Sequence, residues 1–187
     1  MAIVGNHMKE QGKLKDNTIV ATVMSNLGFF LMGKEQGIHI EQTKVGDRYV
    51  LERMLEIGAN LGGEQSGHII FLDENTTGDG LLSALHLLQV MVDTGKPLSE
   101  LSKIMTVLPQ ALVGAKVPNH KKDSYMEYTE IAEAIARVSA KFEGEGRVLI
   151  RPSGTEPLVR VMIEGKDQEM IEKEAKALAE LIQNVML

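Results

Sequence analysis

The 187-residue sequence contains no cysteine and no tryptophan, and only 4% of its residues are aromatic. Without cysteine there is no disulfide framework and no thiolate chemistry, which excludes disulfide-stabilised secreted scaffolds and cysteine-dependent enzymes. We therefore expect a cytoplasmic protein. The first residues, MAIVGNHMKEQGKL, lack the positively charged start of a signal peptide. We expect them to form part of a helix that begins before residue 1, as in a fragment of a longer protein.

The sequence also lacks an excess of positive charge and a long uninterrupted apolar run. The net charge is −6 at pH 7, whereas a nucleic-acid-binding domain more often carries a basic patch. The pair Lys121 and Lys122 is too short to form one, so we expect no nucleic-acid partner. Polar residues interrupt the apolar stretch 81–92, which is too short to span a bilayer. It predicts a buried helix of a soluble domain and no membrane partner.

A strand–turn–strand segment covers residues 147–165, with sequence RVLIRPSGTEPLVRVMIEG. Its turn combines the groups that hold a phosphate. Arg151 offers a planar fork of donors, and Ser153 and Thr155 each offer a hydroxyl. Gly154 lets the backbone N–H approach a ligand. The turn predicts a phosphate-binding site, which we favour over an ordinary hairpin with an exposed arginine.

One residue of this turn opposes that prediction. Glu156 carries a carboxylate, which repels phosphate. We therefore expect its side chain to point away from the ligand, toward Arg160 or Arg147.

A second polar segment, GGEQSGH, covers residues 62–68. Its two leading glycines predict a sharp turn and a close ligand approach. Glu64 accepts hydrogen bonds and Ser66 both donates and accepts, which suits the vicinal hydroxyls of a sugar. His68 is a candidate for proton transfer or phosphate contact. From spacing alone, a local structural role is favoured for His68, and a solvated carboxylate is as good a reading of Glu64 as a ligand.

Two further loops precede helical patterns. In TKVGDRYV, residues 43–50, Gly46, Asp47 and Arg48 stand ahead of a helix. We expect Asp47 to be its N-cap and Arg48 a surface residue, with ligand binding the weaker alternative. The segment TTGDG holds a single carboxylate, Asp79, which is too few for Mg²⁺. It predicts a helix cap and no metal site.

Strands and helices alternate over residues 1–106, which predicts a layered α/β domain with a largely parallel sheet. The expected strands are 18–24, 38–42 and 68–72, and the expected helices are 27–36, 47–57, 80–93 and a short one after Pro97. Glycines at 37 and 58 are expected to end the first two helices.

Residues 107–187 predict a small α+β domain. The stretch 108–118 contains two prolines and reads as a linker, and candidate hinge, with an extended segment. Ser124 and Glu127 resemble a capping box for a helix that ends near Phe142. The hairpin follows, and Asp167 precedes a last helix.

The segments GGEQSGH, RPSGTEP and TKVGDRYV together resemble the α-D-phosphohexomutase superfamily. Its members have four domains, and this chain resembles the third and fourth. The resemblance implies a three-layer α/β sugar-binding domain over 1–106 and a small α+β phosphate-binding domain over 107–187. The family's phosphoserine loop and its Asp-rich Mg²⁺ loop have no counterpart here. We therefore expect Mg²⁺ in the full-length enzyme, with its ligands outside this chain, and no cofactor bound by the chain itself.

The resemblance also suggests residue roles. Glu64 and Ser66 resemble the residues that hold the sugar O3 and O4, and His68 resembles a histidine near the reacting end. The four turn residues from Arg151 to Thr155 resemble the phosphate clamp, and Gly46, Asp47 and Arg48 lie in a loop of variable residue type. The family moves a phosphate between O6 and O1 of a hexose through a phosphoserine and a bisphosphate that turns end for end. Contacts to O3 and O4 serve both orientations, because these atoms lie near the axis of that turn.

Within the superfamily, the Gly-Gly-Glu-Gln form and VGDRYV resemble most the branch that acts on glucosamine phosphates. The implied partners are a hexosamine phosphate and the N-terminal half of the same enzyme, and a homodimer is left open. The chain alone is expected to be inactive. The alternatives are a half of a mannose- or glucose-phosphate mutase, or a phosphosugar-binding module without catalysis.

Overall fold

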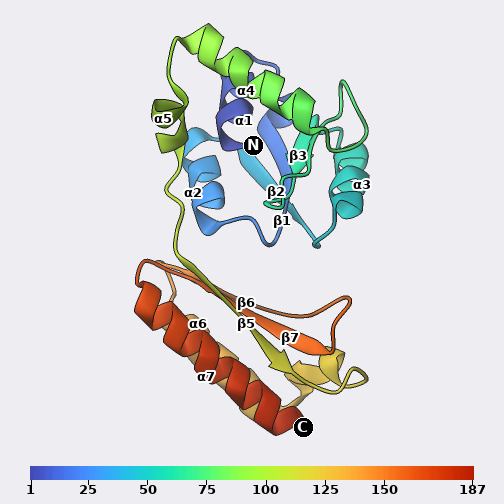
Figure 1. Cartoon of the computed structure of the whole chain (residues 1–187), viewed down its shortest axis with the longest axis vertical. Helices are drawn as coiled ribbons and strands as arrows, with labels where there is room; N and C mark the ends of the chain where they lie inside the picture. Colours follow the sequence, from blue (N-terminus) through green and yellow to red (C-terminus); the bar gives the residue numbers. More distant parts are fainter. The chain divides into compact units, whose positions relative to one another are not determined.

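The structure is a computed structural model that describes residues 1–187. The chain forms two compact units, Met1–Val107 and Leu108–Leu187 (Figure 1). The division lies one residue after the predicted position. None of the helices combines the length and the apolar character needed to cross a bilayer.

The first unit is built on a four-stranded sheet in the order β2-β1-β3-β4. Strand β1 pairs in parallel with β2 and β3, and β4 runs antiparallel to β3. The strands are β1 (Thr18–Thr22), β2 (His39–Thr43), β3 (Leu61–Gly63) and β4 (Ile69–Phe71). Strand β1 ends two residues before its predicted end, and β3 was not predicted, since three residues are too few to show a periodicity.

Helices cover both faces of this sheet, which confirms the three-layer prediction (Figure 1). Successive side chains of a strand point to opposite faces. Ile19 joins the cluster that includes Phe29 of α2, whereas Val20 joins Val50 and Met54 of α3. The helices are α1 (Ala2–Glu10), α2 (Leu27–Gln36), α3 (Asp47–Ile57), α4 (Gly80–Thr94) and α5 (Leu98–Leu101), with 3₁₀ turns η1 (Lys15–Asn17) and η2 (Ser102–Ile104).

Local sequence signals set most helix ends in this unit. Gly37 and Gly58 adopt left-handed conformations, with φ of 63° and 73°, and end α2 and α3 as predicted. Asp79 accepts hydrogen bonds from the backbone N–H groups of Leu81 and Leu82 and begins α4, also as predicted. The N-cap of α3 is Gly46, so the prediction of Asp47 was wrong by one residue.

The prediction that residues 81–92 form a buried helix was wrong in part. They lie in α4, but Val90 is the only residue of the helix that is buried. Leucines along its outward side are exposed. The helix therefore has an apolar face that the first unit does not cover.

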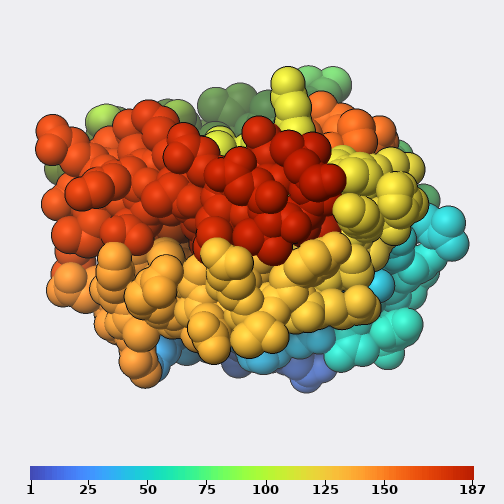
Figure 2. Space-filling model, turned by 90° about the horizontal axis from the view of Figure 1, so that it is seen from below, coloured from blue at the N-terminus to red at the C-terminus, as the bar shows by residue number.

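The second unit is an antiparallel sheet in the order β5-β7-β6, with two helices on one face (Figure 1). Figure 2 shows α7, in red, beside the golden segment that contains α6. The elements are β5 (Gln110–Lys116), η3 (Lys122–Glu127), α6 (Thr129–Lys141), β6 (Arg147–Pro152), β7 (Leu158–Glu164) and α7 (Gln168–Met186). Most of the predicted linker 108–118 is strand β5, so it is not a hinge along that length.

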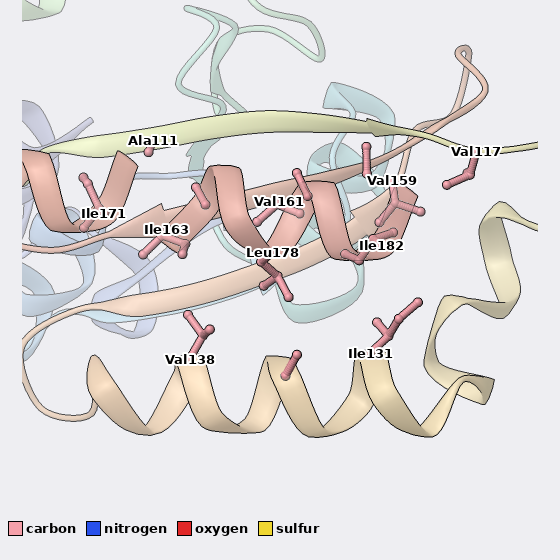
Figure 3. Packing of buried hydrophobic residues seen from close by; sticks show 14 of the residues in the cluster. Ala111, Val117, Ile131, Val138, Val159, Val161, Ile163, Ile171, Leu178 and Ile182 are labelled. Carbon is pink, nitrogen blue, oxygen red and sulfur yellow. The ribbon is translucent and has the colours of Figure 1, made fainter. Parts of the chain in front are cut away.

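Apolar residues between this sheet and its helices form the core of the unit. Val159, Val161 and Ile163 of β7 lie against Ile131 of α6 and Leu178 of α7 (Figure 3). Because side chains alternate along a strand, the residues between them point to the face away from the helices. That face carries the arginines of the predicted phosphate turn.

The start of α6 differs from the prediction. Ser124 lies in η3 and its hydroxyl donates to the carbonyl of Lys121, so it does not form a capping box. Helix α6 begins after Tyr128 without a side-chain cap. The last helix follows the sequence closely, because the Asp167 carboxylate accepts from the N–H of Met170.

Candidate functional site

The first candidate loop follows the carboxyl end of β3. Strand β1 lies between β2 and β3. The chain leaves β1 toward β2 on one side of it and leaves β3 toward β4 on the other side. In open parallel sheets, ligands bind at the carboxyl ends of the strands beside such a switch point. Glu64 is the first residue after β3 and therefore lies at this edge. The fold thus places the predicted sugar loop where α/β sheets bind ligands.

Glu64 joins two loops of the first unit. Its Oε1 accepts a hydrogen bond of 2.9 Å from the backbone N–H of Gly46, 18 residues earlier. Gly46 has φ of 132°, a conformation that favours glycine. The Glu64 side chain is only 11% exposed. The structure therefore brings the GGEQSGH and TKVGDRYV segments together through one carboxylate.

Ser66 and His68 complete a polar cluster around the other carboxylate oxygen of Glu64. The Ser66 hydroxyl lies 3.2 Å from His68 Nδ1 and 3.5 Å from Glu64 Oε2. Glu64 Oε2 lies 3.9 Å from the same ring nitrogen. In a Ser–His–acid relay the hydroxyl and the acid contact opposite ring nitrogens. This cluster is not arranged as such a relay, and its hydroxyl and imidazole are exposed.

The side chains of Asp47 and Arg48 form hydrogen bonds within α3 and not with this cluster. The Asp47 carboxylate accepts from the N–H of Arg48 at the start of α3. Arg48 Nε donates to Glu52 Oε1 at 2.8 Å, and this contact raises the pKa of Arg48. The pair lies on the outside of α3, as expected for a surface arginine.

The glycines at the start of GGEQSGH have a different role from the predicted one. Gly62 and Gly63 lie in β3, not in a turn. A Cβ on Gly62 would lie 2.5 Å from Met54 Sδ and 2.9 Å from Val50 Cγ1. Close packing of α3 on the sheet therefore requires Gly62. The turn itself uses Gly67, whose N–H donates to the carbonyl of Glu64.

The second candidate loop is the turn between β6 and β7. Ser153 is 2% exposed, and its Oγ accepts from the N–H of Glu156 at 3.2 Å. Gly154 and Thr155 are exposed. A Cβ on Gly154 would have no neighbour within 4 Å, and its φ is not positive. Neither packing nor backbone conformation explains this glycine, and its backbone is open to a ligand.

Arg151 and Arg160 lie directly opposite each other on β6 and β7. The Nε atoms of both are buried and have no hydrogen-bond partner. Burial, and secondly the charge of Arg160, lower the pKa of Arg151. Like charges at facing positions of a sheet are destabilising. The pair is therefore a site of unbalanced positive charge that an anion would stabilise.

Sequence reasoning missed Arg160 as a site residue. The hairpin register could have identified Arg160, because residues at equal distances from a turn face each other on the two strands. Sequence reasoning also missed Lys122, whose Nζ donates to the carbonyl of Ser153 at 2.7 Å. The two residues are 31 positions apart, so no local pattern connects them.

Glu156 turns toward Arg160, as expected. Arg160 Nη2 donates to Glu156 Oε2 at 2.6 Å. Arg147 instead pairs with the fully buried Glu164. Near this turn, the single carboxylate of Glu156 is outnumbered by the cations of Lys122, Arg151 and Arg160. The net charge of the turn is therefore positive and favours an anion.

Two histidines of the first unit form pairs with carboxylates away from the candidate loops. A cavity of about 600 Å³ is lined by residues of α1 and α4 and by none of the predicted site residues. His7 pairs there with Asp93, and His86 with Glu74. No three His, Asp or Glu side chains come close enough together to hold a metal ion. The residues present do not fit a Mg²⁺ site.

Two family models match the chain. The model for phosphoglucomutase/phosphomannomutase alpha/beta/alpha domain III matches residues 1–108, and the model for the phosphoglucomutase/phosphomannomutase C-terminal domain matches residues 87–181.

Curated relatives and solved structures give the same result. Phosphoglucosamine mutases of Ruminiclostridium cellulolyticum and Clostridium novyi are each 61% identical over 183 residues, which is 98% of this chain. The chain spans 41% of the length of either relative. A structure of Aspergillus fumigatus N-acetylphosphoglucosamine mutase with GlcNAc-6P and magnesium shares the fold, with a TM-score of 0.77 and 18% identity, and covers all of this chain and 42% of that one.

Proposed function

This chain belongs to the phosphoglucomutase/phosphomannomutase family, and we propose that it recognises the sugar and the phosphate in the interconversion of glucosamine 6-phosphate and glucosamine 1-phosphate. Support for the amino sugar comes from relatives at 61% identity that are named phosphoglucosamine mutase. The activity belongs to a protein of the relatives' length, of which this chain would be the part homologous to domain III and the C-terminal domain.

The observation that carries the proposal is the facing pair of Arg151 and Arg160. Two guanidinium groups with unpartnered Nε atoms supply several donors for the oxygens of a phosphate. Thr155 and the backbone N–H of Gly154 add neutral donors at the exposed end of the turn. Such a grip needs only a phosphate, whichever carbon carries it.

We assign the sugar hydroxyls to Glu64 and Ser66. The carboxylate of Glu64 is fixed by Gly46, so it is oriented before a ligand arrives. His68 lies beside both residues and is exposed, which suits contact with the reacting end of the sugar. Asp47 and Arg48 are the weaker candidates, since their side chains are used within α3.

Phosphoryl transfer depends on positioning and on electrostatic stabilisation of the transferred group. In our proposal these residues hold the substrate, whereas the phosphorylated serine and the Mg²⁺ ligands come from polypeptide outside this chain. The chain alone is then expected to show no turnover of glucosamine 6-phosphate with Mg²⁺ and a bisphosphate activator. Turnover by the purified chain would contradict this division of roles.

A binding experiment on the 187-residue chain tests the phosphate site directly. Inorganic phosphate and glucosamine 6-phosphate are titrated by calorimetry into the wild type, Arg151→Met and Arg160→Met. Each loss of a charge-assisted contact is expected to weaken phosphate binding about tenfold to a hundredfold. Arg137→Met is the matched control, because Arg137 is exposed on α6, on the other side of the sheet.

The outcomes separate the alternatives. Unchanged phosphate binding in both variants would remove the assignment of the turn. Equal binding of glucose, mannose and glucosamine 6-phosphates would leave the phosphate site in place but contradict the amino-sugar assignment. Binding of the sugar phosphate much more tightly than phosphate, without dependence on further polypeptide, would favour a free-standing binding module.

A further inference from the structure

The outward side of α4 is apolar along its length. Leu81, Leu85, Leu88 and Val92 are 73, 54, 53 and 76% exposed. Their spacing of four, three and four residues places them in one stripe on the helix. At about 1.5 Å per residue, the stripe is about 16 Å long. In Figure 1, α4 runs along the outer side of the first unit, and no element of that unit lies beyond it.

Two polar side chains of α4, His86 and Asp93, contact other elements of the first unit. His86 Nε2 lies 2.7 Å from Glu74 Oε1, and its ring stacks on Phe71. Asp93 Oδ2 lies 3.0 Å from His7 Nε2. A surface helix normally has its apolar side inward and its polar side in water. Leu82, Leu87 and Val90 of α4 pack on the core of the first unit, so α4 is apolar on its outward side as well as on its inward side.

Helix α7 shows what a solvent-facing helix of this chain looks like. Its exposed positions include Glu172, Lys173, Lys176 and Glu180, while its apolar side is buried. Charged residues in α4 are limited to Asp93. Contiguous exposed apolar patches mark interaction surfaces, whereas single exposed leucines are ordinary.

We propose that the α4 stripe, Leu81, Leu85, Leu88 and Val92, is covered by the part of the polypeptide that the curated relatives have and this chain does not include. The matched relatives are more than twice as long as the matched region. Interfaces between domains of one polypeptide typically bury about 600–1,500 Å², and their formation costs no translational freedom. A single 16 Å stripe is too small for a stable contact between copies, which typically buries about 1,200–2,000 Å².

The absence of cysteine makes this proposal testable by thiol labelling. Leu85→Cys gives the chain a single reactive group in the stripe, and Leu55→Cys is the matched control on α3, where Leu55 is 61% exposed. Labelling rates are measured in the 187-residue chain and in a cysteine-free hybrid. The hybrid places the remaining part of the R. cellulolyticum relative ahead of residue 1.

In the hybrid, labelling at position 85 is expected to slow at least tenfold, while labelling at position 55 stays the same. Equal rates at position 85 in both proteins overturn the proposal. So does labelling of the short chain that slows with rising protein concentration, because the occupant would then be a second copy. Leu88→Cys repeats the test should the first variant fail to fold. No substrate is involved, so the result is independent of the phosphate-binding experiment.

Discussion

Glu64 in the first unit and Arg151 in the second both lie at the end of a strand, but their charges have different surroundings. The Glu64 carboxylate is bonded to a backbone N–H on one side and lies near a hydroxyl on the other. Arg151 faces another arginine and has an unpartnered Nε. The first loop is held together by its own contacts, whereas the second keeps an excess of positive charge after Glu156 pairs with Arg160.

The glycines of the two loops differ in the same way. Gly62 is required by the packing of α3, since any Cβ there would meet Met54, Val50 and the carbonyl of Val20. Gly154 has empty space around it. A glycine that neither packing nor backbone conformation requires leaves its backbone open to a ligand, and Gly154 is such a glycine within a candidate loop.

The largest effect on stability is expected at the buried ion pair of the second unit, Arg147 and Glu164. Arg147→Met leaves the fully buried Glu164 without its main cation. We expect a loss of about 3 kcal/mol in the free energy of unfolding. Urea unfolding followed by tyrosine fluorescence measures it, since two of the three tyrosines lie in the second unit. Lys166→Met removes an exposed pair with Glu145 and should cost under about 0.5 kcal/mol.

The contrast between the glycines predicts the next largest effect. Gly62→Ala forces Met54 and Val50 apart and should destabilise the first unit by about 2 kcal/mol. Gly154→Ala should change stability by less than about 0.5 kcal/mol and weaken phosphate binding instead. Thermal unfolding and phosphate titration of both variants check this. Equal losses of stability in the two variants would contradict the distinction between a glycine required by packing and one that is not.

The contact between Glu64 and Gly46 predicts a smaller effect. Glu64→Ala removes the acceptor of the Gly46 N–H and should cost about 1 kcal/mol. Hydrogen exchange of the Gly46 amide should become faster. Glu64→Gln keeps an acceptor and should restore part of the protection. Thr155→Ala, at the exposed turn of the other unit, should leave both quantities unchanged.

The smallest expected effect concerns low pH, which should lower the stability of the first unit more than that of the second. The carboxyl groups with clearly lowered pKa are Glu41, Asp73 and Asp93, all in the first unit. Hydrogen bonds cause these shifts, led by those from His39 to Glu41, from Lys15 to Asp73 and from His7 to Asp93.

A carboxyl group with a lowered pKa in the folded state stabilises the protein above its unfolded pKa, and this contribution is lost as pH falls through the folded value. The ordinary pKa values are 4.5 for Glu and 3.8 for Asp, so the stability is lost below about pH 4.5 for Glu41 and below about pH 4 for Asp73 and Asp93. Amide NMR signals followed during acid titration should show the first unit loosening before the second. The reverse order would refute the prediction.

Features set by neighbouring residues could be predicted from the sequence. The bounds of α2 and α3, the cap at Asp79, the start of α7 and the hairpin all follow from capping residues, turn residues and periodicity within a few positions. The errors lie where local rules compete. Ser124 had the sequence of a cap but bonds to Lys121 within a 3₁₀ turn.

The sequence by itself determined the strands and helices with clear periodicity, and it determined which short segments carry polar groups suited to a sugar and a phosphate. Only the tertiary structure decided that Gly46 meets Glu64, that Lys122 reaches Ser153 and that three leucines of α4 face outward. These contacts join residues far apart in the chain. Their formation depends on how sheets and helices pack, and short-range propensity does not encode that packing.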